Sequence, residues 1–337
     1  MTDKMRAAVI DHYHQVDPEI RLVPQPVIHP HDVLVKIRAA SVNPIDTKTM
    51  AGDLRLLLRY RMPLILGSDF AGDVIAVGRQ VTTFQVGDAV YGRPQKDRIG
   101  TFADYLAVDT GDIALMPTNL SYEQAAALPL VGLTSYQALH DLMALRPGKK
   151  VLIQAGSGGV GTVAIQLAKQ LGAYVATTTS AANTAFVQSL GADEVIDYHR
   201  TDFATVLKDY DAVFDMLGGN TLERAFRVVK PGGIIVSVSG RPNGRFAQTY
   251  GLPLWKRGVL RLATRRLTQL EKVSGVSYRF LFMQPSGQQL AELTTLVEQN
   301  KLVPVIDRIY PLTEIAAALT YSRLGKAHGK IIVTMTE

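Results

Sequence analysis

Cysteine is absent from the 337-residue sequence. The chain therefore has no disulfide, no thiolate nucleophile and no cysteine ligand for zinc or an iron–sulfur cluster. Long hydrophobic runs are also missing, because no window approaches the roughly 18 uninterrupted apolar residues of a membrane-spanning helix. The first residues include no apolar segment of signal-peptide length, and we expect a cytoplasmic protein without a membrane span.

The size and composition of the chain fit a globular protein of two domains. Hydrophobic residues make up 47% of the sequence and charged residues 20%, which is ordinary for a protein with a large core. A chain of this length exceeds the usual size of a single core. The formal net charge of +6 favours anionic ligands in general but identifies none.

A glycine-rich segment lies in the middle of the chain, with four glycines in six positions. It follows the strand-like run 151–155 and precedes helix-spaced apolar residues over 162–173. Gly156, Gly158 and Gly161 fit the pattern G-x-G-x-x-G, in which side chains would block the tight turn or keep the backbone away from a pyrophosphate. The N-terminus of the following helix offers free N–H groups to phosphates. We expect a dinucleotide site here, and a plain glycine-rich turn is the alternative.

The hydroxyl residues that follow favour NADPH over NADH. An NAD-binding unit normally places Asp or Glu about 20 residues past the first glycine. This chain has Thr177, Thr178, Thr179 and Ser180 there, and the next acid is Asp193. A carboxylate would repel a 2′-phosphate, whereas hydroxyls can donate hydrogen bonds to it. The same hydroxyls also fit the simple end of a strand.

Strand-like and helix-like segments alternate through this part of the chain, as a doubly wound α/β fold requires. Further strands are expected over 194–198, 211–216, 232–240 and 277–283, and helices near 183–190, 219–229 and 256–270. Right-handed crossovers would assemble a parallel Rossmann sheet of six strands. Ligands bind beyond the carboxyl ends of such strands, so Ser237, Val238 and Ser239 are candidates to meet the nicotinamide.

The first 126 residues have a different pattern. Short strand-like runs separated by Gly, Pro and Asp predict a small β-barrel, and they cover 7–10, 32–42, 69–78, 88–92 and 102–109. The C-terminal segment, with a helix over 313–324, repeats this style, and we place it against the first domain. The expected domains are 1–126 with 285–337, for the substrate and catalysis, and 127–284, for the cofactor.

Seven ordered segments resemble a known family. They are AASVNPIDTK (39–48), LGSDFAGDVIAVG (66–78), FQVGDAVYG (84–92), GTFADYLAVD (100–109), LPLVGLTSYQAL (128–139), AGSGGVG (155–161) and AHGKIIV (327–333). From near Met5 to the C-terminus the chain resembles the medium-chain dehydrogenase/reductase superfamily, specifically its zinc-free quinone oxidoreductase branch. The resemblance implies a GroES-like β-barrel joined to a Rossmann domain, with the active site in the cleft between them.

The residues at the zinc positions of this superfamily predict a protein without a metal. Zinc-dependent relatives would carry Cys near Val42 or Asn43, a His-Glu pair where Ser68 and Asp69 stand, and a lobe of four cysteines. The seven histidines show no metal-binding spacing. Without a Lewis acid, oxidation of an alcohol is difficult, and reduction of an activated double bond is favoured.

The resemblance also implies individual roles. Asn43 would face the nicotinamide and the acceptor, with its amide donating to the developing oxyanion, and Thr134 would contact the nicotinamide ribose or ring. From residue type alone, Asn43 also fits a turn former and Thr134 a helix-start hydroxyl. The implied cofactor contacts are Ser157, Gly158, Gly159, Val160 and Gly161 at the pyrophosphate, Ser180 and Tyr198 near the 2′-phosphate, and Lys330.

Some of these roles have open alternatives. Relatives often carry Lys where this chain has Asn183, so Arg200 or Lys330 would have to supply the cation. Tyr198 also fits a strand-end aromatic residue, and Lys330 a surface lysine. No proton donor stands out among the candidates Asp46, Lys48, Tyr60 and Tyr91.

A basic segment remains outside this scheme. Between Trp255 and Lys272 lie six Lys or Arg residues and one Glu, on a helix-like pattern with an apolar stripe. A solvated helix face is the preferred interpretation, and lipid, RNA or a phosphate-bearing ligand are alternatives.

The sequence thus predicts an NADPH-dependent reductase of quinones or α,β-unsaturated carbonyls. The alternatives are a nucleotide-binding module without turnover, such as a redox sensor or an RNA-binding crystallin-like protein, and a zinc-free alcohol dehydrogenase or enoyl-thioester reductase. The resemblance implies a homodimer that pairs the last Rossmann strand, around VSYRFLFM (276–283), edge to edge. We expect no membrane span, and we do not expect nucleic acid to be a partner.

Overall fold

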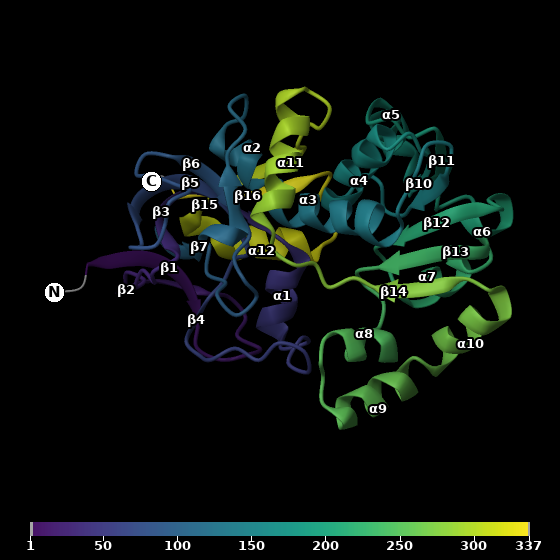
Figure 1. The fold of residues 1–337 in the computed structure, drawn as a ribbon, viewed down its shortest axis with the longest axis horizontal. Coiled ribbons are helices and arrows are strands. Elements are labelled where there is room, and N and C mark those ends of the chain that lie inside the picture. The colour runs from purple at the N-terminus through teal and green to yellow at the C-terminus, as the bar shows by residue number, and fades with distance from the viewer. Residues whose placement is uncertain (1–2, 336–337) are drawn as a thin grey trace. The chain divides into compact units, whose positions relative to one another are not determined.

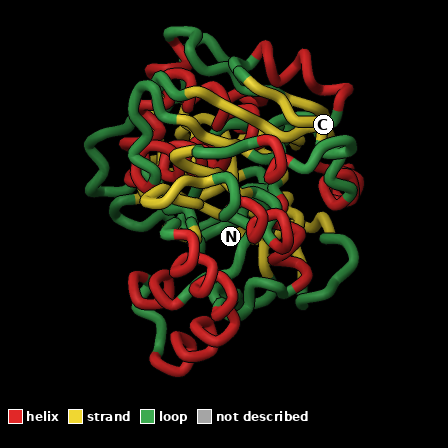
Figure 2. The backbone as a smooth tube through the Cα atoms, turned by 90° about the vertical axis from the view of Figure 1, so that its right-hand side faces the viewer, coloured by secondary structure: helices red, strands yellow, loops and turns green. Residues whose placement is uncertain are grey.

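A computed structural model describes residues 3–335 and separates them into two compact units. The first unit comprises the residues up to Leu133 and those from Gln284 onward, and the second is the continuous segment Thr134–Met283. The expected domain boundaries, after residues 126 and 284, differ from these by seven residues and one residue. Figure 1 labels the helices and strands, and Figure 2 shows helices in red and strands in yellow.

A six-stranded parallel sheet forms the centre of the second unit. Its order is β11 (Glu194–Asp197), β10 (Tyr174–Thr179), β9 (Lys150–Ile153), β12 (Tyr210–Asp215), β13 (Val229–Ser237) and β14 (Ser277–Phe280). Apolar and β-branched residues dominate these strands because helices cover both faces of a parallel sheet. The strand order reverses between β9 and β12, which is the switch point of a Rossmann sheet. The Rossmann prediction is therefore confirmed.

Short helices connect these strands. They are α3 (Pro129–Tyr136), which begins in the first unit, the π-helix η2 (Gln137–Leu142), α4 (Gly159–Gln170), the 3₁₀ turn η3 (Ala181–Asn183), α5 (Thr184–Ser189), α6 (Phe203–Val206), α7 (Gly219–Ala225), α8 (Gly244–Thr249), α9 (Leu254–Ala263) and α10 (Arg265–Ser274). Helix α4 buries the predicted apolar residues Val163, Ile165 and Leu167, but it is buried on every side from Gly161 to Ala168.

The single helix expected over 256–270 is wrong, because the structure contains two helices there. Thr264 separates α9 from α10 and has φ −111° and ψ 16°, outside the helical region. Its Oγ1 donates to the carbonyl oxygen of Leu260 at 2.7 Å. Hydroxyl bonds to the preceding turn commonly bend helices, whereas the apolar spacing continues across the break and gives no sign of it.

Two sheets form the first unit, which has the GroES-like fold that we expect. The small sheet has the order β2 (Glu19–Pro24), β1 (Lys4–Ile10) and β4 (Leu64–Ile65). The larger has the order β15 (Ile306–Pro311), β16 (Lys330–Thr334), β3 (Asp32–Val42), β5 (Asp69–Val77), β6 (Ala89–Gly92) and β8 (Ile113–Leu115), with β7 (Tyr105–Asp109) also paired to β3. Strands β2, β4 and β8 were not expected from the pattern.

The C-terminal segment completes the first unit, as predicted. Strand β16 pairs antiparallel with β3, with Ile331 opposite Val42. The other helices and turns of this unit are α1 (Pro44–Ala51), η1 (Thr110–Asp112), α2 (Tyr122–Ala126), α11 (Gly287–Glu298), η4 (Leu312–Glu314) and α12 (Ile315–Arg323). Ile315 and Leu319 of α12 join residues of β3 and β5 in one buried cluster. The two ends of the chain therefore share a core.

Candidate functional site

The glycine-rich segment forms the turn from β9 to α4, at the switch point of the second unit. A side chain at Gly156 would clash with Thr177 of the neighbouring strand, and one at Gly161 would lie 2.7 Å from the Cα of Gly156. These two glycines are therefore required by the turn and by the close approach of helix and strand. Gly158 is different, because a Cβ there would meet only Ala155 O, at 3.4 Å. Packing therefore does not require a glycine at this position, in contrast to Gly156 and Gly161.

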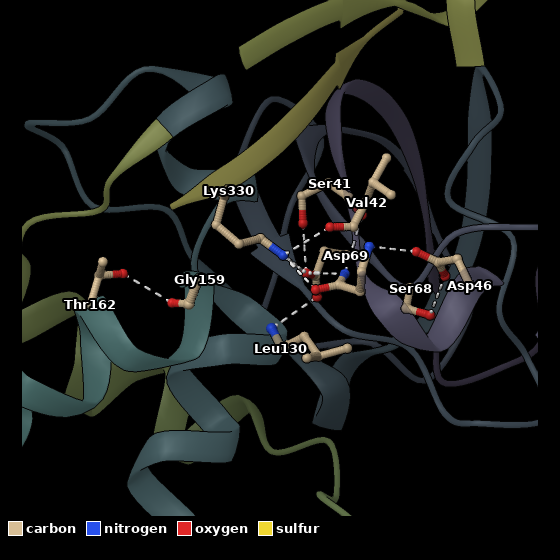
Figure 3. Close-up of polar contacts among 10 residues, drawn as sticks. Ser41, Val42, Asp46, Ser68, Asp69, Leu130, Gly159, Thr162 and Lys330 are labelled. Carbon is tan, nitrogen blue, oxygen red and sulfur yellow. Dashed lines mark hydrogen bonds and ion pairs between the residues drawn. The ribbon is translucent and has the colours of Figure 1, made fainter. Parts of the chain in front are cut away.

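The first turn of α4 can hold an anion. Gly158 is the N-cap residue, with extended backbone, and α4 runs for 12 residues. The N–H groups of Gly159, Val160 and Gly161 have no partner within a helix that starts here, and they carry the positive end of the helix dipole. Thr162 Oγ1 turns back to the carbonyl oxygen of Gly159 at 3.0 Å, as Figure 3 shows.

Four small polar side chains meet at the end of β10. Thr179 Oγ1 donates to Ser157 Oγ at 3.0 Å, and Asn183 Nδ2 lies 3.1 Å from Ser180 Oγ and 3.4 Å from Ser157 Oγ. We call these four residues the open cluster, since Ser157, Ser180 and Asn183 are partly exposed. The cluster contains no charged group. It thus brings the predicted residues Ser157 and Ser180 together, with Asn183 where relatives often carry Lys.

Tyr198 and Arg200 follow the neighbouring strand β11. The backbone N–H of Tyr198 donates to Thr179 O at 3.2 Å, and the Tyr198 side chain is 59% exposed. Asp197 lies opposite Thr179 in the sheet. Its carboxylate accepts from the N–H of His199 at 3.1 Å and lies 3.8 Å from Arg200 Nε. The backbone of Tyr198 thus lies beside Thr179 at the carboxyl end of the sheet, and Arg200 follows two residues later.

Thr134 lies within α3 and not at its start, so the helix-start alternative for its hydroxyl is wrong. The side chain is buried. The next residue, Ser135, donates from Oγ to Val160 O at 3.4 Å. The end of α3 is therefore adjacent to the glycine turn within the second unit.

The Ser237 side chain is buried in the second unit, and its hydroxyl group is hydrogen-bonded there. Its Oγ donates to Asp215 Oδ2 and accepts from the N–H of Gly240 at 2.7 Å. Val238 N–H donates to Asp215 O at 3.1 Å. Burial raises the pKa of Asp215, while Ser237 and two backbone N–H groups oppose that rise. The Ser237 hydroxyl therefore shapes the loop that carries Val238 and Ser239.

Sequence reasoning missed Gln154, which follows β9 directly. Its side chain is fully buried, and neither amide atom has a hydrogen-bond partner among the described residues. A buried amide without partners is costly. Its place at the carboxyl end of β9 makes it a candidate to contact a ligand or a water molecule at the switch point.

The first unit contains a second group of polar residues, which is buried (Figure 3). Asp69 is at its centre, at the start of β5. Its Oδ2 accepts from Ser41 Oγ at 2.7 Å and from Asn43 Nδ2 at 2.9 Å, and its Oδ1 accepts from the N–H of Leu130 at 2.8 Å. Asp69 is completely buried. We call Ser41, Asn43, Asp46, Ser68, Asp69 and Lys330 the closed network.

Lys330 supplies the cation of the closed network. Its Nζ donates to Val42 O at 3.3 Å and to Asn43 Oδ1, and lies 3.6 Å from Asp69 Oδ2. The residue is 4% exposed, so the surface-lysine alternative is wrong. Burial lowers the pKa of Lys330, and the carboxylates of Asp69 and Asp46 partly offset this effect.

Asn43 serves both as a turn residue and as part of the network. It directly precedes α1 with extended backbone, and its N–H donates to Asp46 Oδ2 at 2.8 Å. Its Nδ2 donates to Ser41 O at 3.2 Å as well as to Asp69. Both amide hydrogens are therefore engaged, and donation to an oxyanion would require Asn43 to exchange one of these bonds.

Asp46 is a completely buried carboxyl group of the closed network. Burial raises its pKa to about 7, against the hydrogen bond from Asn43 N–H. Ser68 Oγ donates to its Oδ1 at 3.2 Å. Among the other proton-donor candidates, Tyr91 OH donates to Leu290 O at 2.7 Å, and burial raises the pKa of Tyr60 to about 12.

The closed network does not fit a zinc ion. Zinc prefers thiolate, imidazole and carboxylate ligands, and at the corresponding positions this chain has Asn43, Ser68 and Asp69. A lysine ammonium already contacts Asn43 and Asp69, and it would repel a second cation. Within residues 3–335, no group of three or more His, Asp or Glu side chains is arranged to hold a metal.

Comparison with known proteins matches segments of both units to dehydrogenase families, and the full-length relatives are oxidoreductases. Residues 29–118 match the alcohol dehydrogenase GroES-like domain, and residues 190–333 match the zinc-binding dehydrogenase family. The chain is 34% identical to the mitochondrial NAD(P)H oxidoreductase RTN4IP1 of Mus musculus, over 98% of this chain and 89% of that protein. It is 32% identical to the chloroplastic NADPH-dependent alkenal/one oxidoreductase of Arabidopsis thaliana, over 98% and 79%.

A solved structure extends the similarity to the fold. The quinone oxidoreductase from Coxiella burnetii matches with a TM-score of 0.85 and 33% identity, over 99% of this chain and 100% of that one. In the part of the chain that the structure describes, no helix has the length and hydrophobicity needed to cross a bilayer.

Proposed function

The chain belongs to the medium-chain dehydrogenase/reductase superfamily, in its zinc-free quinone oxidoreductase branch, and on that premise we propose a metal-independent reductase that uses NADPH. Its acceptor would be a quinone or an α,β-unsaturated carbonyl compound. Relatives with names for both acceptor types support this choice.

One observation carries the cofactor proposal. The open cluster presents hydroxyl and amide groups at the end of β10, where an NAD-specific protein would present a carboxylate. Ser180, Asn183 and Tyr198 would hold the 2′-phosphate, with Arg200 nearby as the cation. The turn from Ser157 to Gly161 would hold the pyrophosphate on the first N–H groups of α4.

The remaining residues would position the reactants. Bound NADPH supplies a hydride for the conjugated double bond of the acceptor. Thr134 would contact the nicotinamide or its ribose, with Val238 and Ser239 at the same end of the cofactor. Asn43 would face the acceptor, and the Lys330 bond to its Oδ1 would strengthen its Nδ2 as a donor to the acceptor oxygen.

A direct test measures NADPH oxidation with a panel of quinones, free enones and enoyl thioesters. We expect turnover with the first two classes, faster with NADPH than with NADH. A preference for thioesters would favour the enoyl-thioester reductase alternative. Absence of turnover with all three, despite NADPH binding, would favour a binding module.

A substitution in the open cluster tests the cofactor choice. Ser180→Asp would place a carboxylate beside the 2′-phosphate, and we expect NADPH affinity to fall about 100-fold while NADH affinity changes little. Gln188→Glu, which adds the same charge at an exposed position of α5, is the matched control. Equal losses for both cofactors would contradict the assignment.

Two further expectations belong to this proposal. Strand β14 lies at the edge of the six-stranded sheet, and we infer a homodimer that pairs this edge with its copy. Sedimentation velocity of the purified chain would measure its mass.

We also propose a cytoplasmic location, to be checked by cell fractionation, although related proteins are named as mitochondrial or chloroplastic.

A further inference from the structure

Helix α9 presents an apolar side to solvent. Leu254, Trp255, Val259 and Leu262 are 50 to 80% exposed. At 100° per residue these four side chains fall on one side of the helix, together with the exposed Gly258. We call Leu254, Trp255, Val259 and Leu262 the exposed stripe. Single exposed hydrophobic residues are ordinary on protein surfaces, whereas a contiguous apolar stripe marks an interaction site.

The other side of the helix is anchored to the second unit. Leu260 of α9 and Thr264 after it are buried, and Leu267 of α10 belongs to the core cluster beneath the sheet. Arg257 Nε donates to the carbonyl oxygen of Leu252 at 2.7 Å, which connects α9 to the loop before it. The orientation of α9 is therefore determined by packing, and the exposed stripe is the side that packing leaves outward.

Cations border the exposed stripe on both sides. By helical spacing, Lys256 lies along one border, and Arg257 and Arg261 lie along the other. The surrounding residues 241–276 contain eight Lys or Arg and a single acid, Glu271. Glu271 accepts from the N–H of Tyr278 at 2.8 Å and lies 4.0 Å from Arg245. This part of the second unit therefore carries a strong positive charge around an apolar centre.

We propose that α9 is an interfacial membrane helix that binds the surface of an anionic lipid bilayer. The exposed stripe would enter the boundary between headgroups and acyl chains, with the bordering Lys and Arg side chains on the anionic headgroups. The helix would lie in the plane of the surface and would not cross the bilayer. This inference is independent of the acceptor and of the cofactor.

Two other occupants fit the surface less well. In a symmetric contact between two copies, Lys256, Arg257 and Arg261 of both chains would meet without an acidic partner, at a cost in electrostatic repulsion. An RNA strand would engage the cations and could stack on Trp255. It would leave Leu254, Val259 and Leu262 unused, whereas a bilayer engages all the members of the stripe.

The chain contains a natural reporter for this inference. Trp255 is the only tryptophan in the sequence, so intrinsic tryptophan emission reports on the exposed stripe alone. With phosphatidylglycerol vesicles we expect a blue shift of the emission and co-sedimentation of the protein. With phosphatidylcholine vesicles we expect neither, and added salt should weaken the binding because the headgroup attraction is electrostatic.

Matched variants separate the apolar contribution from the charge. Leu254→Ser combined with Leu262→Ser keeps the reporter and should weaken vesicle binding about tenfold or more. The control Val273→Ser removes an equally exposed apolar side chain from α10 and should bind as the wild type does. Arg261→Glu should weaken binding about tenfold, whereas Lys301→Glu, an equal charge change on the first unit, should not.

Three outcomes would overturn the inference. One is a tryptophan emission that does not respond to anionic vesicles, while circular dichroism and the melting temperature show a folded protein. Another is a dimer that the Leu254→Ser, Leu262→Ser variant abolishes, which would assign the stripe to a second copy. A blue shift with single-stranded RNA that exceeds the shift with vesicles would assign it to nucleic acid.

Discussion

The closed network and the open cluster are both built around small polar residues, but they differ in exposure and charge. In the closed network, Asp69 and Lys330 are buried and each contacts several groups of the same unit. In the open cluster, Ser180 and Asn183 are uncharged and partly exposed, with hydrogen bonds of 3.1 to 3.4 Å.

This difference indicates two kinds of role. A buried charge without a partner is very costly, so the closed network must stay intact for the first unit to fold. Exposed donors with long hydrogen bonds lose little when they change partner, so the open cluster can bind a ligand without disturbing the sheet. Substitutions of the buried charged residues Asp69, Lys330 and Asp46 should therefore affect mainly stability, and substitutions in the open cluster mainly affinity.

The largest expected effect is on stability, from Lys330→Met. Removing the ammonium leaves the buried Asp69 carboxylate without its ion-pair partner, and we expect the free energy of unfolding to fall by about 3 to 5 kcal/mol. Chemical denaturation measures this change. Lys326→Met removes an exposed charge from the same segment and serves as the control.

A double variant distinguishes the charge from the loss of packing. Lys330→Met combined with Asp69→Asn removes both charges and should recover part of the lost stability. If Lys330→Met were as stable as Lys326→Met, the closed network would not hold a buried ion pair.

The pH dependence of stability should show the next largest effect, through Asp46. Its folded pKa of about 7 lies above the ordinary value of 3.8, so the folded state holds the proton that the unfolded state releases in this range. Stability from this group therefore falls as pH rises from about 4 to 7 and is constant above that. At about 1.4 kcal/mol per pH unit, the loss amounts to at most about 4 kcal/mol.

Asp46→Asn should remove this component. Unfolding measured at pH 5 and pH 8 should show that the variant gains stability relative to wild type at the higher pH. Asp53→Asn, which removes an exposed carboxyl just beyond the same helix, is the matched variant. Parallel pH profiles for wild type and Asp46→Asn would show that Asp46 does not titrate in this range.

The substitution Tyr198→Phe should have the smallest effect, and it should change only the affinity for NADPH. Loss of one phenol donor should weaken NADPH binding about fivefold, near 1 kcal/mol for one hydrogen bond, without changing NADH binding or the melting temperature. Fluorescence titration with both cofactors measures this. Tyr174→Phe, at the amino end of β10, is the control, and an equal loss there would remove Tyr198 from the cofactor site.

The Rossmann sheet could be predicted because its signals are local. Each buried parallel strand is a short apolar run, and the glycine turn joins adjacent segments of the chain. The open cluster was predictable in part for the same reason, since Ser180 and Asn183 are three residues apart. Gln154 could not be recognised, because nothing in its neighbours shows that its amide would be buried without a partner.

The closed network depends on contacts that no local pattern reveals. Lys330 meets Val42 and Asn43 from 288 and 287 positions away, and only the pairing of β16 with β3 brings them together. The resemblance pointed to Lys330 and Asn43 separately, without their contact. The break at Thr264 and the short strands β4 and β8 were missed because two or three residues carry too little periodicity.

The pairing of β16 with β3 has a consequence for biosynthesis. Strand β3 leaves the ribosome roughly 15 to 60 seconds before β16, at typical translation rates of 5 to 20 residues per second. During that interval β3 cannot pair with β16. The Asp69 carboxylate also lacks the Lys330 ammonium group, which has not yet been synthesised. The second unit, a continuous segment, can fold in the meantime. The first unit can therefore complete its fold only after the second unit has been synthesised.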